Sequence, residues 1–131
     1  MAHLALLHDA DPDRREQFTA GVRRLFAELP GTVAGEVTAG PVACLWAAGP
    51  TAPIDVHRHG DRLAVLIGYA VDDAGRWLTA SQLGDAWLSD DDATAYDGYH
   101  VAFVFDPTRG LAAGVDPLGL FPLYHASLPD G

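Results

Sequence analysis

The chain of 131 residues is long enough for one globular domain, which should bury roughly two thirds of the surface that its unfolded form exposes. Hydrophobic residues make up 49% and charged residues 20%, an ordinary balance that excludes a disordered chain and a membrane-embedded class. Eight Lys and Arg against eighteen Asp and Glu give a net charge of −10, which would repel a phosphate backbone and excludes nucleic acid as a partner.

A strand followed by a helix is predicted at the start of the chain. Residues 3–8 form a short apolar run, and Asp11 and Pro12 then offer an N-cap carboxylate and a proline suited to the first helical turn. The apolar residues that follow recur at helical spacing on one stripe: Phe18, Val22, Leu25, Phe26 and Leu29. Pro30 and Gly31 should end the helix. The first apolar run is too short for a signal peptide, so the cytoplasm is the expected location.

Short apolar runs in the middle of the chain predict three strands. They are residues 42–48, 54–56 and 63–71. The third run is almost continuously apolar, which is typical of a strand covered on both faces and predicts helices on one face and a second sheet on the other. Cys44 is the single cysteine and lies in the first run, where we expect a small buried hydrophobic residue.

The second half of the chain predicts a helix and then a hairpin. Thr79 or Ser81 can cap a short helix, because apolar residues follow each of them at helical spacing. Residues 99–105 and 111–115 have β character on either side of a polar turn, which predicts two paired strands. A last short strand is predicted at residues 123–126.

Two histidines and a carboxylate next to the second predicted strand raise the hypothesis of a metal site. Alternate residues of a strand project to one face, so His57 and His59 with Asp55 are suited to a zinc corner. No further ligand can be assigned, so a solvated strand end is the favoured interpretation and no cofactor is predicted.

Other polar and aromatic residues are assigned structural roles. Ser89 and the three aspartates after it predict a helix-capping, solubilising loop with too few ligands for calcium: Asp90, Asp91 and Asp92. The large aromatics can line a small-molecule pocket, but a place in the core is favoured for them: Trp46, Trp77, Trp87, Tyr96 and Tyr99. Four histidines fall in predicted strands, where each should share a hydrogen bond: His3, His8, His100 and His125.

The C-terminal third of the chain resembles the end of the glutaminase domain of asparagine synthetases. Residues 98–106, 111–116 and 119–124 match it in order and without a gap. The family has there a Gly-x-Phe-Ala-Phe-Ala-Leu-Trp-Asp strand, an Ala-Arg-Asp strand end and a Gly-x-x-Pro-Leu-Tyr-Tyr segment. The matched motif residues are Gly98, Asp106, Gly119, Pro122, Leu123 and Tyr124. Physically, Gly119 suits a tight turn and Pro122 suits the first residue of a strand.

The resemblance implies an α+β fold, the αββα sandwich of N-terminal nucleophile (Ntn) hydrolases, in which two stacked antiparallel β-sheets are flanked by helices. Residues 1–7 and 63–69 fall where the family has Met-Cys-Gly with an apolar run and a strand that ends in Asn-Gly-Glu. The family domain continues beyond its Pro-Leu-Tyr-Tyr strand, so we expect a shortened sandwich. The 1–131 domain is then either the leading part of a longer asparagine synthase-related protein or a standalone relative.

The family's catalytic residues are replaced at the matching positions. Family members attack the glutamine amide with an N-terminal cysteine that is exposed when methionine is removed, and Ala2 stands at that position here. The asparagine that binds the oxyanion corresponds to Ile67, and the acidic residue that holds glutamine corresponds to Tyr69. Only Gly68 of that triplet is retained.

The departures extend to the strand end near residue 115, where the family arginine corresponds to Val115 and the aspartate is retained as Asp116. We call the following six positions the degenerate pocket: Ala2, Ile67, Gly68, Tyr69, Val115 and Asp116. The sequence also contains neither the Ser-Gly-Gly-x-Asp-Ser loop with which the family's synthetase half binds ATP pyrophosphate nor a phosphate-binding P-loop.

Together these features imply a catalytically inactive, glutamine amidotransferase-like domain, which is not an enzyme by itself. Its expected role is structural, or one of interaction with an ATP-dependent, amide-forming synthetase of biosynthesis. The partners considered are that synthetase domain, in the same protein or separate, and a second copy of the chain. The alternative is a small-molecule binding module that holds an amino-acid-like ligand in the remodelled pocket.

Overall fold

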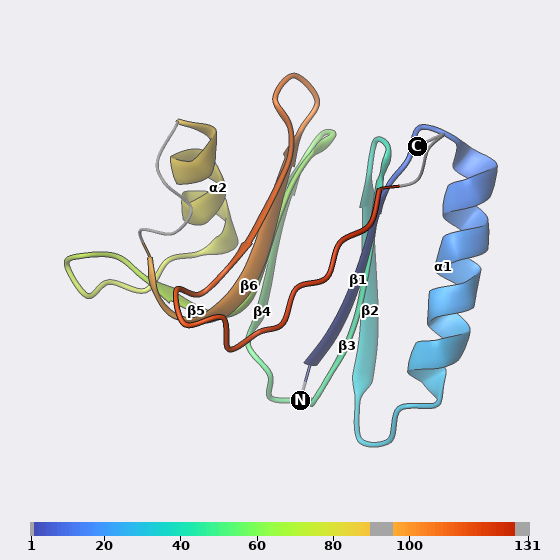
Figure 1. Cartoon of the computed structure of the whole chain (residues 1–131), viewed down its shortest axis with the longest axis horizontal. Helices are drawn as coiled ribbons and strands as arrows, with labels where there is room; N and C mark the ends of the chain where they lie inside the picture. Colours follow the sequence, from blue (N-terminus) through green and yellow to red (C-terminus); the bar gives the residue numbers. More distant parts are fainter. Residues whose placement is uncertain (1, 90–95, 128–131) are drawn as a thin grey trace. The chain divides into compact units, whose positions relative to one another are not determined.

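The computed structural model describes residues 2–89 and 96–127 and shows an α+β chain with two antiparallel sheets and two helices (Figure 1). The chain divides into two compact units, Met1–Ala52 with Ser127–Gly131, and Pro53–Ala126. Each unit contains one of the sheets and one of the helices. We therefore describe each unit by itself.

The first unit is a three-stranded sheet with one helix along it. Its elements are β1 (Ala2–His8), α1 (Pro12–Ala27), β2 (Val33–Ala39) and β3 (Val42–Ala48). The strand order is β1-β3-β2, and both pairings are antiparallel. Figure 1 shows α1 running along this sheet. The predicted first strand, the helix and the predicted strand at residues 42–48 are confirmed.

The start of α1 forms as its sequence predicts. The Asp11 carboxylate accepts hydrogen bonds from the backbone N–H groups of Asp13 and Arg14 (2.8 and 3.3 Å), so it is the N-cap, and Pro12 is the first helical residue. The Arg14 guanidinium donates to both carboxylate oxygens of Asp9 at 2.7 and 2.8 Å. This fork joins the first turn of the helix to the end of β1.

The strand β2 is not predicted by the sequence. It reads Val-Ala-Gly-Glu-Val-Thr-Ala, which has no apolar run and only a weak alternation. Its central glycine, Gly35, lies opposite Trp46 of β3, and a Cβ at that position would overlap the indole ring. The glycine that weakens the sequence signal for a strand is therefore what lets the Trp46 ring lie across β2.

The second unit is a four-stranded antiparallel sheet with one helix against it. Its elements are β4 (Ile54–His59), β5 (Arg62–Val71), α2 (Ala80–Leu88), β6 (Asp97–Asp106) and β7 (Gly110–Val115). The strand order is β4-β5-β6-β7, so strands that follow one another in the chain are also neighbours in the sheet. The predicted hairpin is confirmed, because β6 pairs with β7 from Asp106 opposite Gly110 to Val101 opposite Val115.

The core of the second unit lies between α2 and the sheet. Leu83 and Trp87 of the helix pack in one buried cluster with Leu66 of β5 and Val104 of β6. Five successive residues of β5, Leu63 to Ile67, are buried, as the nearly continuous apolar run predicts. The helix therefore covers one face of this sheet and fixes which residues of β5 and β6 face it.

The strand predicted at residues 123–126 is absent. These residues have no strand partner among the described residues, and Leu123 and Tyr124 are exposed. An apolar segment becomes a strand only where another strand can satisfy its backbone groups. Pro122 therefore does not begin a strand, and His125 does not lie in one; the predicted acidic loop at residues 90–92 lies outside the described residues.

The start of α2 provides a test of local stability. Thr79 is its N-cap: its hydroxyl accepts from the Gln82 backbone N–H (3.2 Å), while the Gln82 side chain accepts from the Thr79 N–H (2.9 Å). Replacing Thr79 with alanine should lower the free energy of unfolding by about 1 kcal/mol, because this capping box is lost. Urea unfolding followed by circular dichroism measures it. A loss no larger than that of Ser81→Ala, two positions into the helix, would contradict the role of the cap.

No helix in residues 2–89 and 96–127 is both long and apolar enough to cross a bilayer.

Candidate functional site

Five of the six residues of the degenerate pocket lie in the second unit: three on β5, one at the end of β7 and Asp116 directly after it, with β6 between the two strands. Ile67 of β5 is opposite Val101 of β6, which is in turn opposite Val115 of β7. In the next row Gly68 is opposite His100, and the backbone N–H of Asp116 donates to the His100 carbonyl at 2.9 Å. The sequence places these residues only along the chain. The sheet register brings four of them into two neighbouring rows, and Tyr69 lies in the row after, opposite Tyr99.

The sixth residue, Ala2, belongs to the first unit, where it opens β1 opposite Ala48 of β3. Its side chain is a methyl group, which has no lone pair with which to attack a carbonyl.

Two glycines hold β5 and β6 close together at this place. Gly68 has a φ of +96° and Gly98 a φ of +125°, both in the region that favours glycine. A Cβ on Gly68 would overlap the carbonyl oxygen of Tyr99, and a Cβ on Gly98 would overlap that of Tyr69. The retained glycine of the degenerate pocket therefore has a structural requirement of its own.

A histidine and an aspartate are buried beside these glycines. His100 and Asp116 are fully buried, and neither ring nitrogen of His100 has a hydrogen-bond partner among the described residues. Desolvation by burial lowers the pKa of His100 below its ordinary value of 6.5, against the opposing effects of the Asp116 charge and of the Tyr69 backbone. The imidazole is therefore neutral at pH 7.

The aspartate is held by the turn after β7. One oxygen, Oδ1 of Asp116, accepts from the backbone N–H groups of Leu118 and Leu120 at 3.1 and 3.2 Å. Burial acts to raise the pKa of Asp116, but the backbone hydrogen bonds from Leu120, Phe121 and Leu118 outweigh it and hold the pKa below its ordinary value. The second oxygen, Oδ2, has no partner among the described residues. The site thus contains a carboxylate that is charged at pH 7 and has one free acceptor.

Aromatic side chains form a row beside the buried pair, which we call the aromatic row: Trp77, Tyr69, Tyr99 and Phe121. Tyr69 and Tyr99 are directly opposite on β5 and β6, so their side chains emerge on the same face. The Trp77 ring lies 4.8 Å from the Tyr69 ring, and the Phe121 ring 4.3 Å from the Tyr99 ring, centroid to centroid. The prediction of a core position is confirmed for Trp87 but wrong for Trp77 and Tyr99, which are 71% and 47% exposed.

The lone cysteine is a packing residue. Cys44 of β3 is fully buried, and desolvation raises the pKa of its thiol well above its ordinary range. A thiol that stays protonated at neutral pH is a poor nucleophile, so the prediction of a small buried hydrophobic residue is confirmed.

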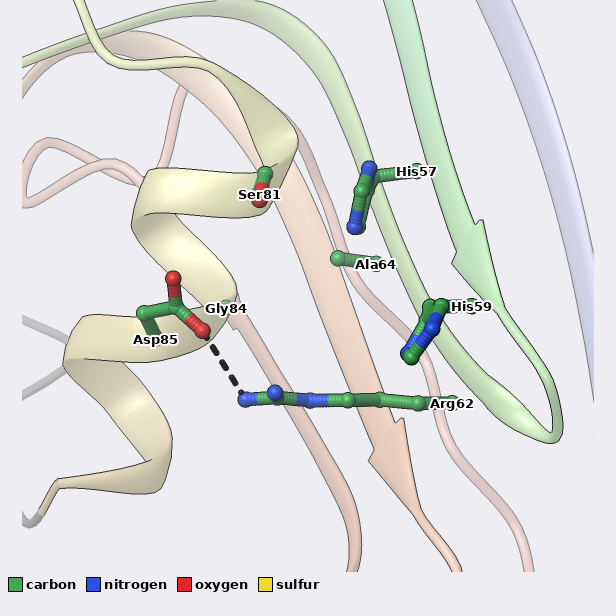
Figure 2. A pocket seen from close by; sticks show the side chains of 7 residues that line it. All are labelled: His57, His59, Arg62, Ala64, Ser81, Gly84 and Asp85. Atoms are coloured by element: carbon green, nitrogen blue, oxygen red, sulfur yellow. Dashed lines mark hydrogen bonds and ion pairs between the residues drawn. The ribbon is translucent and has the colours of Figure 1, made fainter.

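A separate pocket of about 200 Å³ lies between β4, β5 and α2 (Figure 2). His57 and His59 of β4 point into it from one side, and Ser81 and Asp85 line it from α2. Arg62 donates to the Asp85 carboxylate at 3.1 Å. The Arg62 guanidinium, which lines this pocket, is thus already paired with a carboxylate on the opposite side of it.

The metal corner considered for Asp55, His57 and His59 is not formed by the described residues. The carboxylate of Asp55 accepts a hydrogen bond from the backbone N–H of Ala80, the first residue of α2, at 2.7 Å. The described residues contain no group of three or more His, Cys, Asp or Glu side chains placed to hold a metal ion. His57 and His59 are exposed at the end of β4, as the solvated strand end predicts.

Comparisons with protein-family models, with curated proteins and with solved structures found no match.

The two rows on β5, β6 and β7 contain no hydroxyl or thiol nucleophile, and neighbouring rows of a sheet project their side chains to opposite faces. Ile67 and Val115 present aliphatic side chains, and the polar groups of the adjoining row are a neutral imidazole and a carboxylate. Sequence reasoning missed His100, Trp77 and Phe121 as members of this site. Their proximity depends on the register of β5 against β6 and on the turns before and after these strands, which no local pattern specifies.

Proposed function

We propose that this chain is a catalytically inactive glutaminase-type domain of the asparagine synthase-related kind, kept for a structural or interaction role. Its partner is an ATP-dependent, amide-forming synthetase in the same polypeptide or in a separate one, in the cytoplasm. The observation that carries the proposal is the set of neighbouring rows on β5, β6 and β7, where Ile67 and Val115 share one row and Tyr69 lies two positions along β5, at positions that the resemblance assigns to glutamine chemistry.

The hairpin at the heart of the resemblance supports the proposal. The segments matched to the family are β6 and β7, and they pair in one continuous antiparallel ladder through a turn at residues 107–109. Gly119 has a φ of +63°, which is the left-handed conformation that a turn glycine supplies. The proposal includes the finer fold that the resemblance implies, in which the two sheets stack between the helices as a shortened αββα sandwich.

The replaced side chains explain why such a domain would not hydrolyse glutamine. An aliphatic residue such as Ile67 cannot donate a hydrogen bond to a developing oxyanion, and the loss of one donor typically slows turnover roughly a hundred- to a thousandfold. Tyr69 replaces a carboxylate that would pair with the ammonium group of the substrate. Ala2 and the buried thiol of Cys44 supply no nucleophile, so the first chemical step has no attacking group.

The proposal predicts that the whole chain releases no glutamate from glutamine above the enzyme-free rate. An assay that couples glutamate to a dehydrogenase, run with purified protein at neutral pH, measures this. The matched control is the Asp116→Ala variant, which removes the retained polar residue of the site. A saturable turnover in the unaltered chain that disappears in this variant would overturn the inactive assignment.

A second function is favoured by a specific observation, the unpaired polar atoms of the buried row. The two ring nitrogens of His100 and Oδ2 of Asp116 are buried without partners among the described residues, and such groups ordinarily find a ligand or a water. In this alternative the row holds an amino-acid-like ligand. A thermal-shift screen against amino acids and their amides tests it: a dose-dependent shift that His100→Phe abolishes favours the binding module, and no shift with any of them rejects it.

A further inference from the structure

We infer that the aromatic row of Trp77, Tyr69, Tyr99 and Phe121 is a docking surface for arginine or lysine side chains of a partner protein. The inference deepens the proposed function, on which it rests for the existence of a partner. It adds the place on this chain that the partner contacts and the chemistry of the contacting group.

The first step is that the row is continuous. The two inner rings, Tyr69 and Tyr99, come from directly opposite positions of β5 and β6. Each has an outer ring against it, Trp77 at 4.8 Å and Phe121 at 4.3 Å between centroids, and both pairs are tilted, at interplanar angles of 51° and 37°. Four rings from four separate segments therefore present their faces and edges as one surface.

The second step is that the row is exposed in a way that packing within the second unit does not explain. Trp77 is 71% exposed, and Tyr69 and Tyr99 are 42% and 47% exposed. Leu118 and Leu120, which precede Phe121 in the chain, are also exposed. Contiguous exposed apolar side chains on a folded unit mark an interaction surface, whereas singly scattered ones do not.

The third step is that the row is held in place before any partner arrives. Gly68 and Gly98 let the backbones of Tyr69 and Tyr99 approach closely. Trp77 forms a β-bridge with Val71, and the backbone hydrogen bond from Leu78 to Ala70 (2.9 Å) closes the other side of its loop. A surface that is already ordered loses little conformational entropy on binding.

The fourth step is that the negative charge around the row favours a positively charged partner side chain. The faces of aromatic rings attract cations, most strongly for tryptophan. The sequence next to the row contains Asp72, Asp73 and Asp97, and Asp97 lies opposite Val71, the bridge partner of Trp77. The nearby guanidinium, Arg76, is already paired with Asp72 at 2.7 Å. An incoming cation therefore meets ring faces on a chain with a net charge of −10, with two further aspartates close by in the sequence.

The test uses the whole chain and a short peptide with two arginines between glycines, compared with the same peptide in which citrulline replaces each arginine. Citrulline keeps the planar group and removes the charge. Binding is followed through the Trp77 indole N–H signal in nitrogen–proton NMR spectra. The salt concentration is about 0.1 M, at which screening already limits long-range electrostatic attraction. We expect saturable binding of the arginine peptide and roughly three- to thirtyfold weaker binding of the citrulline peptide.

The matched variants separate the row from the general charge of the chain. Trp77→Leu and Tyr99→Leu should each weaken binding of the arginine peptide, whereas Tyr124→Leu should not, because Tyr124 is 89% exposed and outside the row. For the Trp77 variant the Tyr69 and Tyr99 amide signals replace the indole signal, and thermal melts establish that each variant is folded. Equal binding of the two peptides, no saturation, or an affinity that neither row variant changes would overturn the inference. Glutamine turnover would overturn the proposed function and leave this result intact.

Discussion

Replacing Gly68 with alanine is expected to lower the free energy of unfolding by at least about 3 kcal/mol, the largest effect of any single change considered. Two costs combine there. The φ of +96° is one that residues with a Cβ rarely adopt, and the added Cβ would overlap the Tyr99 carbonyl oxygen. Because that oxygen belongs to the neighbouring strand, relief requires β5 and β6 to separate locally. Urea unfolding followed by circular dichroism measures the loss.

Gly110 provides the matched control, because it isolates the cost of the backbone conformation. Its φ is +89°, close to that of Gly68, but nothing lies within 4 Å of a Cβ built on it. Gly110→Ala should therefore cost only about 1–2 kcal/mol. If the two variants were equally destabilised, the close approach of the Tyr99 carbonyl would not be the reason that residue 68 is a glycine.

The second large effect is expected at His100, where a change should stabilise the protein. A buried imidazole whose two nitrogens lack partners has lost its hydration without replacement hydrogen bonds. His100→Phe keeps a ring of similar shape and removes both polar atoms, so the free energy of unfolding at pH 7 should rise by about 1–3 kcal/mol. Thermal and urea unfolding at pH 7 measure it. A loss of stability would show that the imidazole has a partner, such as a bound ligand or water.

The same histidine predicts how stability depends on pH. The pKa of His100 in the folded protein lies below its ordinary value of 6.5, so as pH falls the unfolded chain takes up a proton before the folded chain does. The contribution of this group to stability should therefore be complete above pH 6.5 and decline as pH falls from 6.5 toward the folded pKa. In His100→Phe this decline should be missing. An unchanged slope between the two proteins in that range would contradict the assignment of a buried, neutral imidazole.

The parts of the fold that the sequence predicts are those specified by local chemistry. Asp11 with Pro12 and Thr79 with Gln82 are caps whose partners lie within a few residues, and both helices begin where these caps predict. The hairpin of β6 and β7 likewise depends on a short turn and two apolar runs. Interactions of this kind can be read from a short window of sequence.

The parts that the sequence does not predict depend on which segments pair with and cover one another, which the local residue pattern does not specify. β2 contains a glycine at its centre, yet it pairs with β3 along its whole length, and the Trp46 ring lies against that glycine. Residues 123–126 are apolar enough for a strand but have no partner within the described residues. The general burial of large aromatics predicts a core position for Trp77, but Trp77 lies in a loop closed by its bridge to Val71 and is exposed there.

In the candidate site, too, some residues can be assigned from the sequence and others are found only in the structure. The resemblance assigns residues 67–69 and 115–116 to one pocket, and the register puts Ile67 and Val115 in one row of the sheet, with Val101 of β6 between them. His100 joins them only through that register, because it is opposite Gly68 and its carbonyl receives the Asp116 N–H. The sequence can therefore nominate replaced positions, while the polar groups now present at the site require the structure.

The central claim is that the rows on β5, β6 and β7 no longer hold glutamine, and the most direct measurement of it is a titration of the isotope-labelled chain with glutamine. Amide signals of Gly68, Tyr69, His100 and Asp116 report on these rows in nitrogen–proton NMR spectra. We predict no saturable change in these signals up to the solubility limit of glutamine. Saturable shifts confined to these residues would show that the rows still bind glutamine and would contradict the central claim.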